Sequence, residues 1–311
     1  SFADAYAPLD FGARRFCEAR VWSYFNMFTD QGKAFLPYIQ GETNDPMPLF
    51  IKPNRKISVQ DVQNAMRDHY EGTPLDISND FGAGPYKTPY RLSPLNFKVD
   101  GQEYFNERPI STQQSGFVFV AQMRASMPDA VGGVLWFGTD DANMTVFTPV
   151  YCCTDKVPVC YTRVGGADYI TFSWDSSFWI FNWVSNMVYP HYDLMIGDIR
   201  ATQHELEGTF HEAQAGIESM ATRLYQKNPD EAKAFLTNYT NMTAQSTFVT
   251  WKRLGEFIIV KYADGVIRKM KDGKFERNSI GQPAGVIRPG YPKEFLEEYV
   301  KQTGERYKVK E

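Results

Sequence analysis

The densest group of potentially reactive side chains in this sequence is "RDHYEGTPLD", residues 67–76. Within five positions it places a guanidinium, two carboxylates and an imidazole, at Arg67, Asp68, Glu71 and His69. Such a group could form a reactive or ligand-binding site. It could also be the solvated end of a helix that happens to be polar.

The residues before this segment predict a helix over 58–71. Ser58 and Asp61 form a capping pair, and apolar residues recur at helical spacing. Gly72 stands where a left-handed residue would end the helix. The two acids of the segment would then lie at the negative end of the helix dipole, which disfavours carboxylates. This local mismatch suggests a partner elsewhere in the fold, although a screened surface terminus remains the alternative.

Arg124 is a second candidate, because it closes the apolar run "SGFVFVAQMR". Its guanidinium could lie in solvent at the end of a strand. It could also point into a cleft and bind a carboxylate or an oxyanion. Asp140 and Asp141 stand between two predicted strands, where a turn is the simplest interpretation and a polar lip over a site is the alternative.

The remaining motifs exclude several kinds of site. His204 and His211 are seven residues apart, and "HELE" is not a zinc-binding HExxH motif. The paired glycines lack the spacing of nucleotide-binding loops. We therefore expect no metal and no cofactor. The four cysteines, expected as free thiols with a disulfide from Cys160 to one of its neighbours left open, are Cys17, Cys152, Cys153 and Cys160.

Composition limits the possible partners. The 311 residues are 43% hydrophobic and carry a net charge of −4, without a long basic block, which argues against nucleic-acid binding. No apolar stretch reaches the roughly 20 residues that a membrane span needs. Aromatic residues make up 15% of the chain, enough for a dense core, a sugar-stacking surface or an interface between copies in a homo-oligomer.

The pattern along the chain predicts an α+β fold in two parts. Residues 1–172 should form an antiparallel-sheet part, with mixed strand and short helix at the start and three strands after residue 115. Residues 117–121 are continuously apolar, which predicts a strand covered on both faces. Residues 173–311 should be mainly helical and pack on the sheet part.

Five helical segments are expected in the second part. An aromatic segment ends at Pro190, and a heptad-like apolar repeat over 196–224 predicts one long amphipathic helix. A helix start at 228–231, a helical stretch near 241–260 and a last helix that ends at Gly304 follow.

Several motifs, taken in order, resemble those of the C69 dipeptidases. They lie between residues 14 and 265 and read "ARVWSYF", "RDHYEGTPLD", "RPISTQQSGFVFVAQMR", "GGVLWFGTDDANMTVFTPVY" and "SWDSSFWIFNWVSNMVYP". The resemblance implies an N-terminal-nucleophile hydrolase with a four-layer αββα core. It also implies a cysteine at the mature N-terminus whose thiolate attacks the peptide carbonyl, and a short peptide as substrate.

The resemblance covers the C-terminal portion of such an enzyme. We therefore expect the nucleophilic cysteine upstream of residue 1, in an N-terminal part of the same protein, and no activity from the chain alone. In the wider superfamily an arginine late in the chain helps to hold the active site, and Arg124 is the best match. His69 and Glu71 become candidate substrate-binding residues. Ser1 as an N-terminal nucleophile is the weaker possibility, since "SFADAYAPLD" is not an apolar strand.

A non-catalytic protein that binds peptides or glycans through an aromatic surface is the alternative function. Trp174, Trp179 and Trp183 of the aromatic helical segment could supply that surface.

Overall fold

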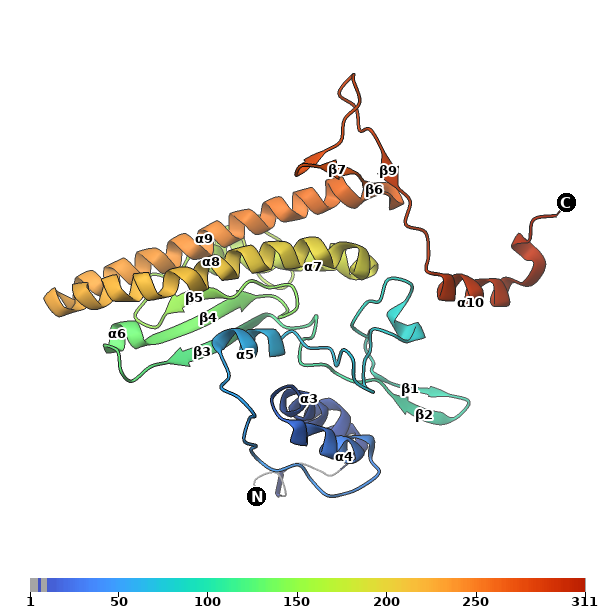
Figure 1. The fold of residues 1–311 in the computed structure, drawn as a ribbon, viewed down its shortest axis with the longest axis horizontal. Helices are drawn as coiled ribbons and strands as arrows, with labels where there is room; N and C mark the ends of the chain where they lie inside the picture. The colour runs from blue at the N-terminus through green and yellow to red at the C-terminus, as the bar shows by residue number, and fades with distance from the viewer. Residues whose placement is uncertain (1–4, 7–9, 311) are drawn as a thin grey trace.

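A three-stranded antiparallel sheet lies at the centre of the structure, a computed structural model that describes residues 5–6 and 10–310 (Figure 1). Its strands, in spatial order, are β3 (Phe117–Met123), β4 (Gly133–Thr139) and β5 (Thr148–Tyr151). The predicted meander is therefore confirmed. Ser1, considered above as a nucleophile, lies outside the described residues.

Three helices cover one face of this sheet (Figure 1). They are α7 (Ser177–Val188), α8 (Tyr192–Lys227) and α9 (Pro229–Tyr262). The largest core cluster joins the sheet to these helices, and in it Phe181 of α7 stacks on Trp251 of α9 with ring centroids 4.6 Å apart. Burial of such large aromatic rings is the main favourable contribution to this packing.

The other face of the sheet is open in the described chain, where no element covers the second face of the strand predicted to be covered on both. Burial alternates along β3: Val118 and Val120 are buried, whereas Phe117, Phe119 and Met123 are 60%, 49% and 69% exposed. Successive side chains of a strand point to opposite faces, so these three lie on one apolar surface. We call Phe117, Phe119 and Met123, with Leu135, Phe137 and Val150, the open sheet face.

The N-terminal part is helical, without the strand expected among residues 1–30 in the described positions. Its helical segments are α2 (Phe11–Ala13), η1 (Arg14–Glu18), α3 (Ala19–Phe28), η2 (Asp30–Phe35) and α4 (Leu36–Gln40). They form a second, smaller core in which Trp22, Tyr38 and Tyr70 are buried. A hairpin follows later in the chain, made of β1 (Asn96–Val99) and β2 (Gln102–Phe105).

Helix α5 (Val59–Ala65) is shorter than predicted. Ser58 and Asp61 form the predicted capping box, but the helix ends at Ala65 rather than at Glu71. Arg67 and Asp68 donate their backbone N–H groups three residues back, to Asn64 and Ala65, which tightens the chain into turns. The acids of "RDHYEG" therefore lie beyond the helix, not in its last turn.

The C-terminal residues extend away from the sheet and its helices (Figure 1). They begin with two short antiparallel strand pairs. Strand β6 (Ile267–Arg268) pairs with β9 (Val286–Ile287), and β7 (Met270–Lys271) pairs with β8 (Lys274–Phe275). Helix α10 (Lys293–Thr303) ends at Gly304 as predicted. The remaining short helical segments are η3 (Phe81–Ala83), α6 (Asp129–Gly132), η4 (Val159–Tyr161), η5 (Val164–Gly166), η6 (Tyr189–His191), η7 (Ala263–Gly265) and η8 (Gly304–Tyr307).

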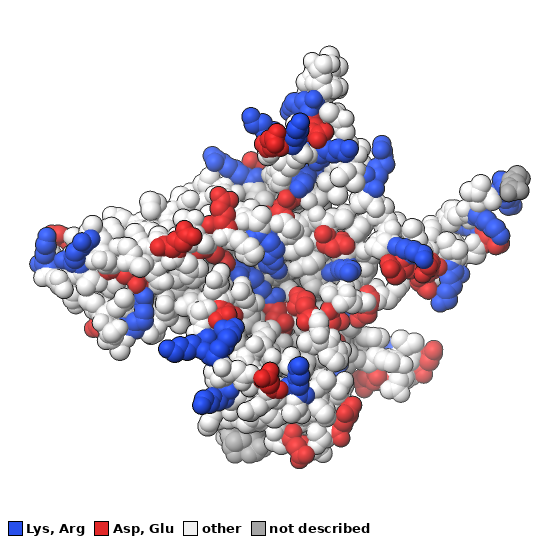
Figure 2. All heavy atoms as spheres, in the orientation of Figure 1, with Lys and Arg blue, Asp and Glu red and all other residues white. Residues whose placement is uncertain are grey.

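These elements confirm a mixed α+β fold; the four-layer sandwich and the division at residue 172 stay predictions. Over the face drawn in Figure 2, acidic and basic side chains are interspersed rather than gathered by sign. None of the helices in the described ranges is long and apolar enough to cross a membrane. All four cysteines are free, with Cys160 buried.

Candidate functional site

The segment that contains His69 is held in a strained turn. Tyr70 has a φ of +67°, an uncommon backbone conformation for a bulky residue, and its side chain is fully buried. Its hydroxyl donates to the carbonyl oxygen of Arg108 at 2.8 Å. Strain of this kind persists only where the surrounding structure enforces it, and such residues cluster at functional sites.

His69 and Glu71, the two candidate substrate-binding residues, contact one another directly. The backbone N–H of His69 donates to Glu71 Oε2 at 2.7 Å, and His69 Nδ1 lies 3.0 Å from Glu71 Oε1. The imidazole is buried, whereas the Glu71 side chain is half exposed. Burial raises the pKa of Glu71, but the hydrogen bonds and charge of His69 outweigh it, so the net pKa is lowered.

Asp140 and Asp141 follow β4 and are both buried, at 2% and 1% exposure. Asp140 has a φ of +69° and accepts hydrogen bonds from Asn182 Nδ2 at 2.9 Å and Ser185 Oγ at 2.7 Å. Asp141 accepts one from the Tyr189 hydroxyl at 2.7 Å. Burial, reinforced by repulsion from Asp141, raises the pKa of Asp140 to about 7. This pair is therefore more than a surface turn.

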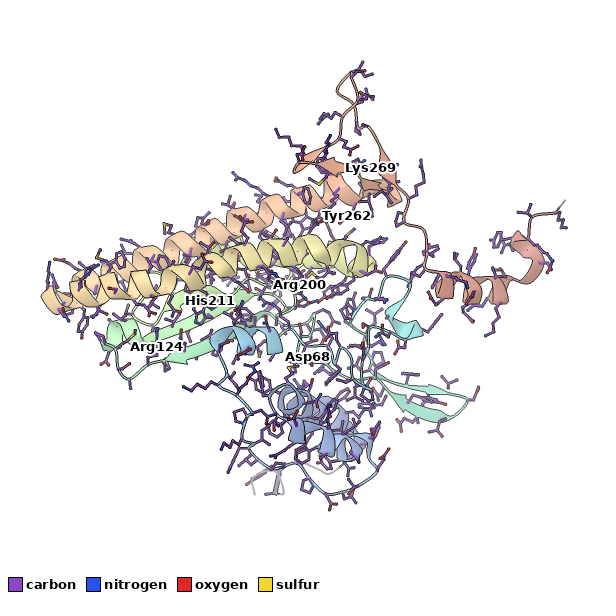
Figure 3. The ribbon with its side chains drawn as sticks, viewed as in Figure 1. Asp68, Arg124, Arg200, His211, Tyr262 and Lys269 are labelled. Atoms are coloured by element: carbon purple, nitrogen blue, oxygen red, sulfur yellow. The ribbon has the colours of Figure 1, made fainter. Side chains whose placement is uncertain are left out.

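Helix α8 connects the two acidic segments. Arg200, which is labelled in Figure 3, donates to the side chain and backbone of Asn143, just after the acidic pair. Arg67 Nη2 donates to Glu207 Oε1 at 2.5 Å, and that oxygen also accepts from the backbone of Phe147 at 2.9 Å.

The residues of "RDHYEG" and of the stretch that follows β4 thus meet in one buried network. Its charges are compensated by partners from three separate parts of the chain, as buried charges require. The Tyr192 hydroxyl belongs to it through hydrogen bonds with the side-chain amide of Asn143, at 3.2 and 3.3 Å. We call this network the polar cluster, which consists of Arg67, His69, Glu71, Asp140, Asp141, Asn143, Tyr189, Tyr192, Arg200 and Glu207.

Arg124 lies apart from this cluster, directly after the C-terminal end of β3 (Figure 3). Its two terminal nitrogens hold Glu218 of α8 in a bidentate ion pair, each contact at 2.7 Å. Glu218 also accepts from the Tyr151 hydroxyl at 3.2 Å. The structure therefore brings His69 and Glu71 together but does not bring Arg124 to them.

An open cavity of about 560 Å³ lies at the other end of the sheet. Two sets of aromatic rings line it, one from the sheet and η4 and one from the loop before α7 and α7 itself. The first set is Phe117, Phe137 and Tyr161, and the second is Tyr169, Phe178 and Trp179. This volume falls in the range of about 300–1,000 Å³ that is typical of small-molecule sites.

The cavity adjoins the polar cluster. Thr139 lines the cavity and is followed directly by Asp140. Its hydroxyl lies 2.9 Å from Ser177 Oγ, at the start of α7, and α7 also supplies the partners of Asp140. The cavity and the polar cluster are therefore both positioned by β4 and α7.

In residues 5–6 and 10–310, no group of three or more His, Cys, Asp or Glu side chains is arranged to hold an ion. His211 instead stacks on Trp136, with ring centroids 4.3 Å apart, and its Nε2 lies 2.9 Å from Gln63 Oε1. Burial lowers its pKa.

Comparison with known proteins gives a consistent result. The model of the family described as "Peptidase family C69" matches residues 1–205. A "Probable dipeptidase B" of Lactococcus lactis is 26% identical over 250 residues, 79% of this chain and 47% of that protein. A "Probable dipeptidase" of Latilactobacillus sakei is 27% identical over 224 residues, 72% of this chain and 40% of that protein. One of Salmonella dublin is 28% identical over 150 residues, 48% of this chain and 29% of that protein. The chain thus spans less than half the length of these relatives.

Proposed function

Because the chain belongs to peptidase family C69, we propose that it is the C-terminal part of a dipeptidase that hydrolyses short peptides through a cysteine nucleophile. The observation that carries the proposal is the polar cluster. Its two segments, 67–71 and 140–143, lie within the matched residues and are far apart in sequence, yet they meet beside an open cavity.

The nucleophile is proposed to come from a part of the protein outside this chain. Cys160 lines the cavity, but burial raises its pKa to about 11, so its sulfur is a thiol rather than the reactive thiolate. An N-terminal cysteine whose own α-amine acts as base would supply the thiolate. It would attack the peptide carbonyl carbon, the C–N bond would break as the amine leaves with a proton, and water would hydrolyse the thioester.

The open sheet face supports the proposal that a further layer of the fold lies outside this chain. Exposed rings such as Phe117 and Phe119 form a continuous apolar surface with Leu135 of the neighbouring strand. Exposed patches of this kind mark surfaces that another layer covers. We propose that a second sheet from the N-terminal part packs over Phe119, Met123 and Leu135, which would complete the four-layer αββα core. The end of the face at Phe117 and Phe137 would stay open as part of the cavity lining. The polar cluster then contributes to binding and orienting the peptide, with His69 and Glu71 nearest to solvent through the half-exposed Glu71 carboxylate.

The alternative of a non-catalytic binding protein has one observation in its favour. Tyr169, Phe172 and Trp174, which precede α7 in the sequence, are 82%, 44% and 49% exposed, and Phe172 and Trp174 pack edge to face with ring centroids 4.7 Å apart. Such a surface could bind a peptide or a glycan without chemistry.

The deciding experiment uses the protein expressed from its complete open reading frame and a panel of dipeptides. Dipeptide hydrolysis that is abolished when its N-terminal cysteine is replaced by alanine supports the proposal. A protein that binds peptides but cleaves none supports the alternative. Hydrolysis that survives loss of every cysteine contradicts the proposed chemistry.

A further inference from the structure

The cavity beside the polar cluster has walls suited to a planar ring. On the sheet side, Phe137 and Tyr161 meet edge to face, with centroids 5.2 Å apart. Elsewhere in the lining, Tyr169 and Phe178 meet edge to face, with centroids 5.9 Å apart. Aromatic rings favour such offset and edge-to-face arrangements, so a further ring in the cavity would find favourable partners among the rings that line it.

The charge of the cavity favours a neutral occupant. Among the described residues that line it, Arg163 is the one cation and Asp168 the one anion, and they face each other at 3.4 Å. Asp168 also accepts a hydrogen bond from the backbone of Ile170 at 3.0 Å. Since the two charges compensate one another, the cavity offers no unpaired charge for a cationic or anionic side chain.

From these features we infer that the cavity is a specificity subsite that takes the aromatic side chain of a peptide substrate, an inference that rests on the proposed function. A backbone anchored near Thr139 would leave the peptide bond on the side of Asp140 and the polar cluster. The enzyme would then prefer dipeptides that contain phenylalanine or tyrosine over those with only small side chains.

Gly116 offers a direct way to fill the cavity. It lines the cavity, its φ lies outside the left-handed region, and a Cβ added there would meet only the Tyr169 hydroxyl, at 3.5 Å. Gly116→Leu should therefore place a branched side chain where the substrate ring would lie. The matched control is Gly216→Leu, at an exposed position of α8 where an added Cβ meets nothing within 4 Å.

The test measures kcat/KM of the protein from its complete open reading frame on Phe-Ala, Ala-Phe and Ala-Ala. For wild type and the control, we expect the better aromatic dipeptide to exceed Ala-Ala. Gly116→Leu should lower kcat/KM for the aromatic dipeptide by about 10- to 100-fold and change that for Ala-Ala by no more than about 3-fold. An unchanged ratio between the two substrates would overturn the inference while leaving the dipeptidase proposal intact.

Two further measurements keep the outcome decisive. If Gly116→Leu does not fold, Tyr169→Ala removes a wall residue that is 82% exposed, and it should also reduce the aromatic preference. If wild type cleaves no dipeptide, the proposed function fails, and the subsite is judged by calorimetric titration with Phe-Ala and Ala-Ala. Tighter binding of Phe-Ala that Gly116→Leu weakens supports the subsite; equal binding of the two overturns it.

Discussion

Arg67 and Glu207 form a buried ion pair, with Arg67 Nη2 2.5 Å from Glu207 Oε1, across 140 positions of sequence. Their side chains are 10% and 3% exposed, so neither charge could be left to water if its partner were lost. This contact fastens the turn after α5 to α8 and so fixes the position of His69.

Removal of one partner should therefore be costly. Arg67→Ala would leave Glu207 charged and buried, and we expect a loss of about 3–5 kcal/mol in the free energy of unfolding. Urea unfolding measures this loss. Lys301→Ala, which breaks an exposed pair with Glu298, serves as the control and should change stability by less than about 1 kcal/mol. Equal, small effects of the two substitutions would contradict the role given to the buried pair.

Arg124→Lys separates two roles for that residue. Arg124 as a catalytic residue stays a prediction, and it requires kcat/KM to fall by roughly one to three powers of ten at unchanged stability. The bidentate contact with Glu218 favours a structural role instead. Lysine keeps the charge but loses the planar fork, so we expect a lower melting temperature. Measuring kcat/KM and the melting temperature of this one variant decides between the catalytic and the structural role.

Asp140 should make stability depend on pH. In the folded chain its pKa is raised to about 7, first by burial and then by Asp141, whereas an unfolded aspartate titrates near 3.9. The folded state thus binds more protons between these values, so the contribution is present below about pH 4 and is lost as pH rises through 7. The slope approaches about 1.4 kcal/mol per pH unit for one full proton.

Asp140→Asn tests this slope. Because asparagine does not ionise, the free energy of unfolding should fall less steeply between pH 5 and 8 in the variant than in wild type, as measured by urea unfolding at each pH. Asp68, whose pKa burial raises to about 6 against the hydrogen bond from Ser23, contributes the same sign in both proteins. Parallel curves for wild type and variant would show that Asp140 does not titrate in this range.

The open sheet face should make the 311-residue chain associate when it is expressed alone. Phe119→Ser replaces a half-exposed ring at its centre and should reduce the mass measured by light scattering. Phe81→Ser removes a ring that is 77% exposed elsewhere and is the matched control. A chain that is monomeric before any substitution would count against a missing layer.

The isolated chain should hydrolyse no dipeptide. Burial holds Cys160, the cavity cysteine, as a thiol, and the reactive cysteine is proposed to lie outside this chain. A dipeptide assay on the purified chain checks this. Turnover that persists in Cys17→Ala would show that the nucleophile has been assigned to the wrong part of the protein.

The periodicity of apolar residues correctly predicted those helices and strands that are specified by neighbouring residues in the sequence. The meander of β3, β4 and β5, and the start of α9 at Pro229, follow from apolar patterns and capping chemistry. Alternation of burial along β3 could not be predicted, because its residues are apolar on both faces. Continuous apolar residues predicted a cover on both faces, but the pattern does not show which part of the protein would supply the second cover.

Tertiary contacts explain the remaining differences. The sequence suggested separate helical stretches at 228–231 and 241–260, yet α9 continues between them through threonines of modest helix propensity. Thr240 Oγ1 accepts from the backbone of Tyr151 at 3.3 Å, and Thr243 Oγ1 donates to the Tyr239 carbonyl at 3.0 Å, so packing on β5 sustains the helix there.

The polar cluster was only partly predictable. His69 and Glu71 were recognised from their crowding, but burial of Asp140 and Asp141 depends on partners that come from α7 and η6. A signal for α8 was present: Gln203 occupies a position of its apolar repeat, and it donates to the carbonyl oxygens of Asn143 and Thr145. Polar residues on an otherwise apolar helix stripe indicate a buried polar partner.

The two ion pairs of α8 also restrict how this protein can evolve. Glu207 and Glu218 are eleven residues apart, and each holds an arginine from a different part of the chain. One inserted or deleted residue between them would turn one carboxylate by about 100° around the helix axis relative to the other. We therefore expect this stretch to keep a constant length among homologues, and each glutamate to covary with its arginine, Arg67 or Arg124.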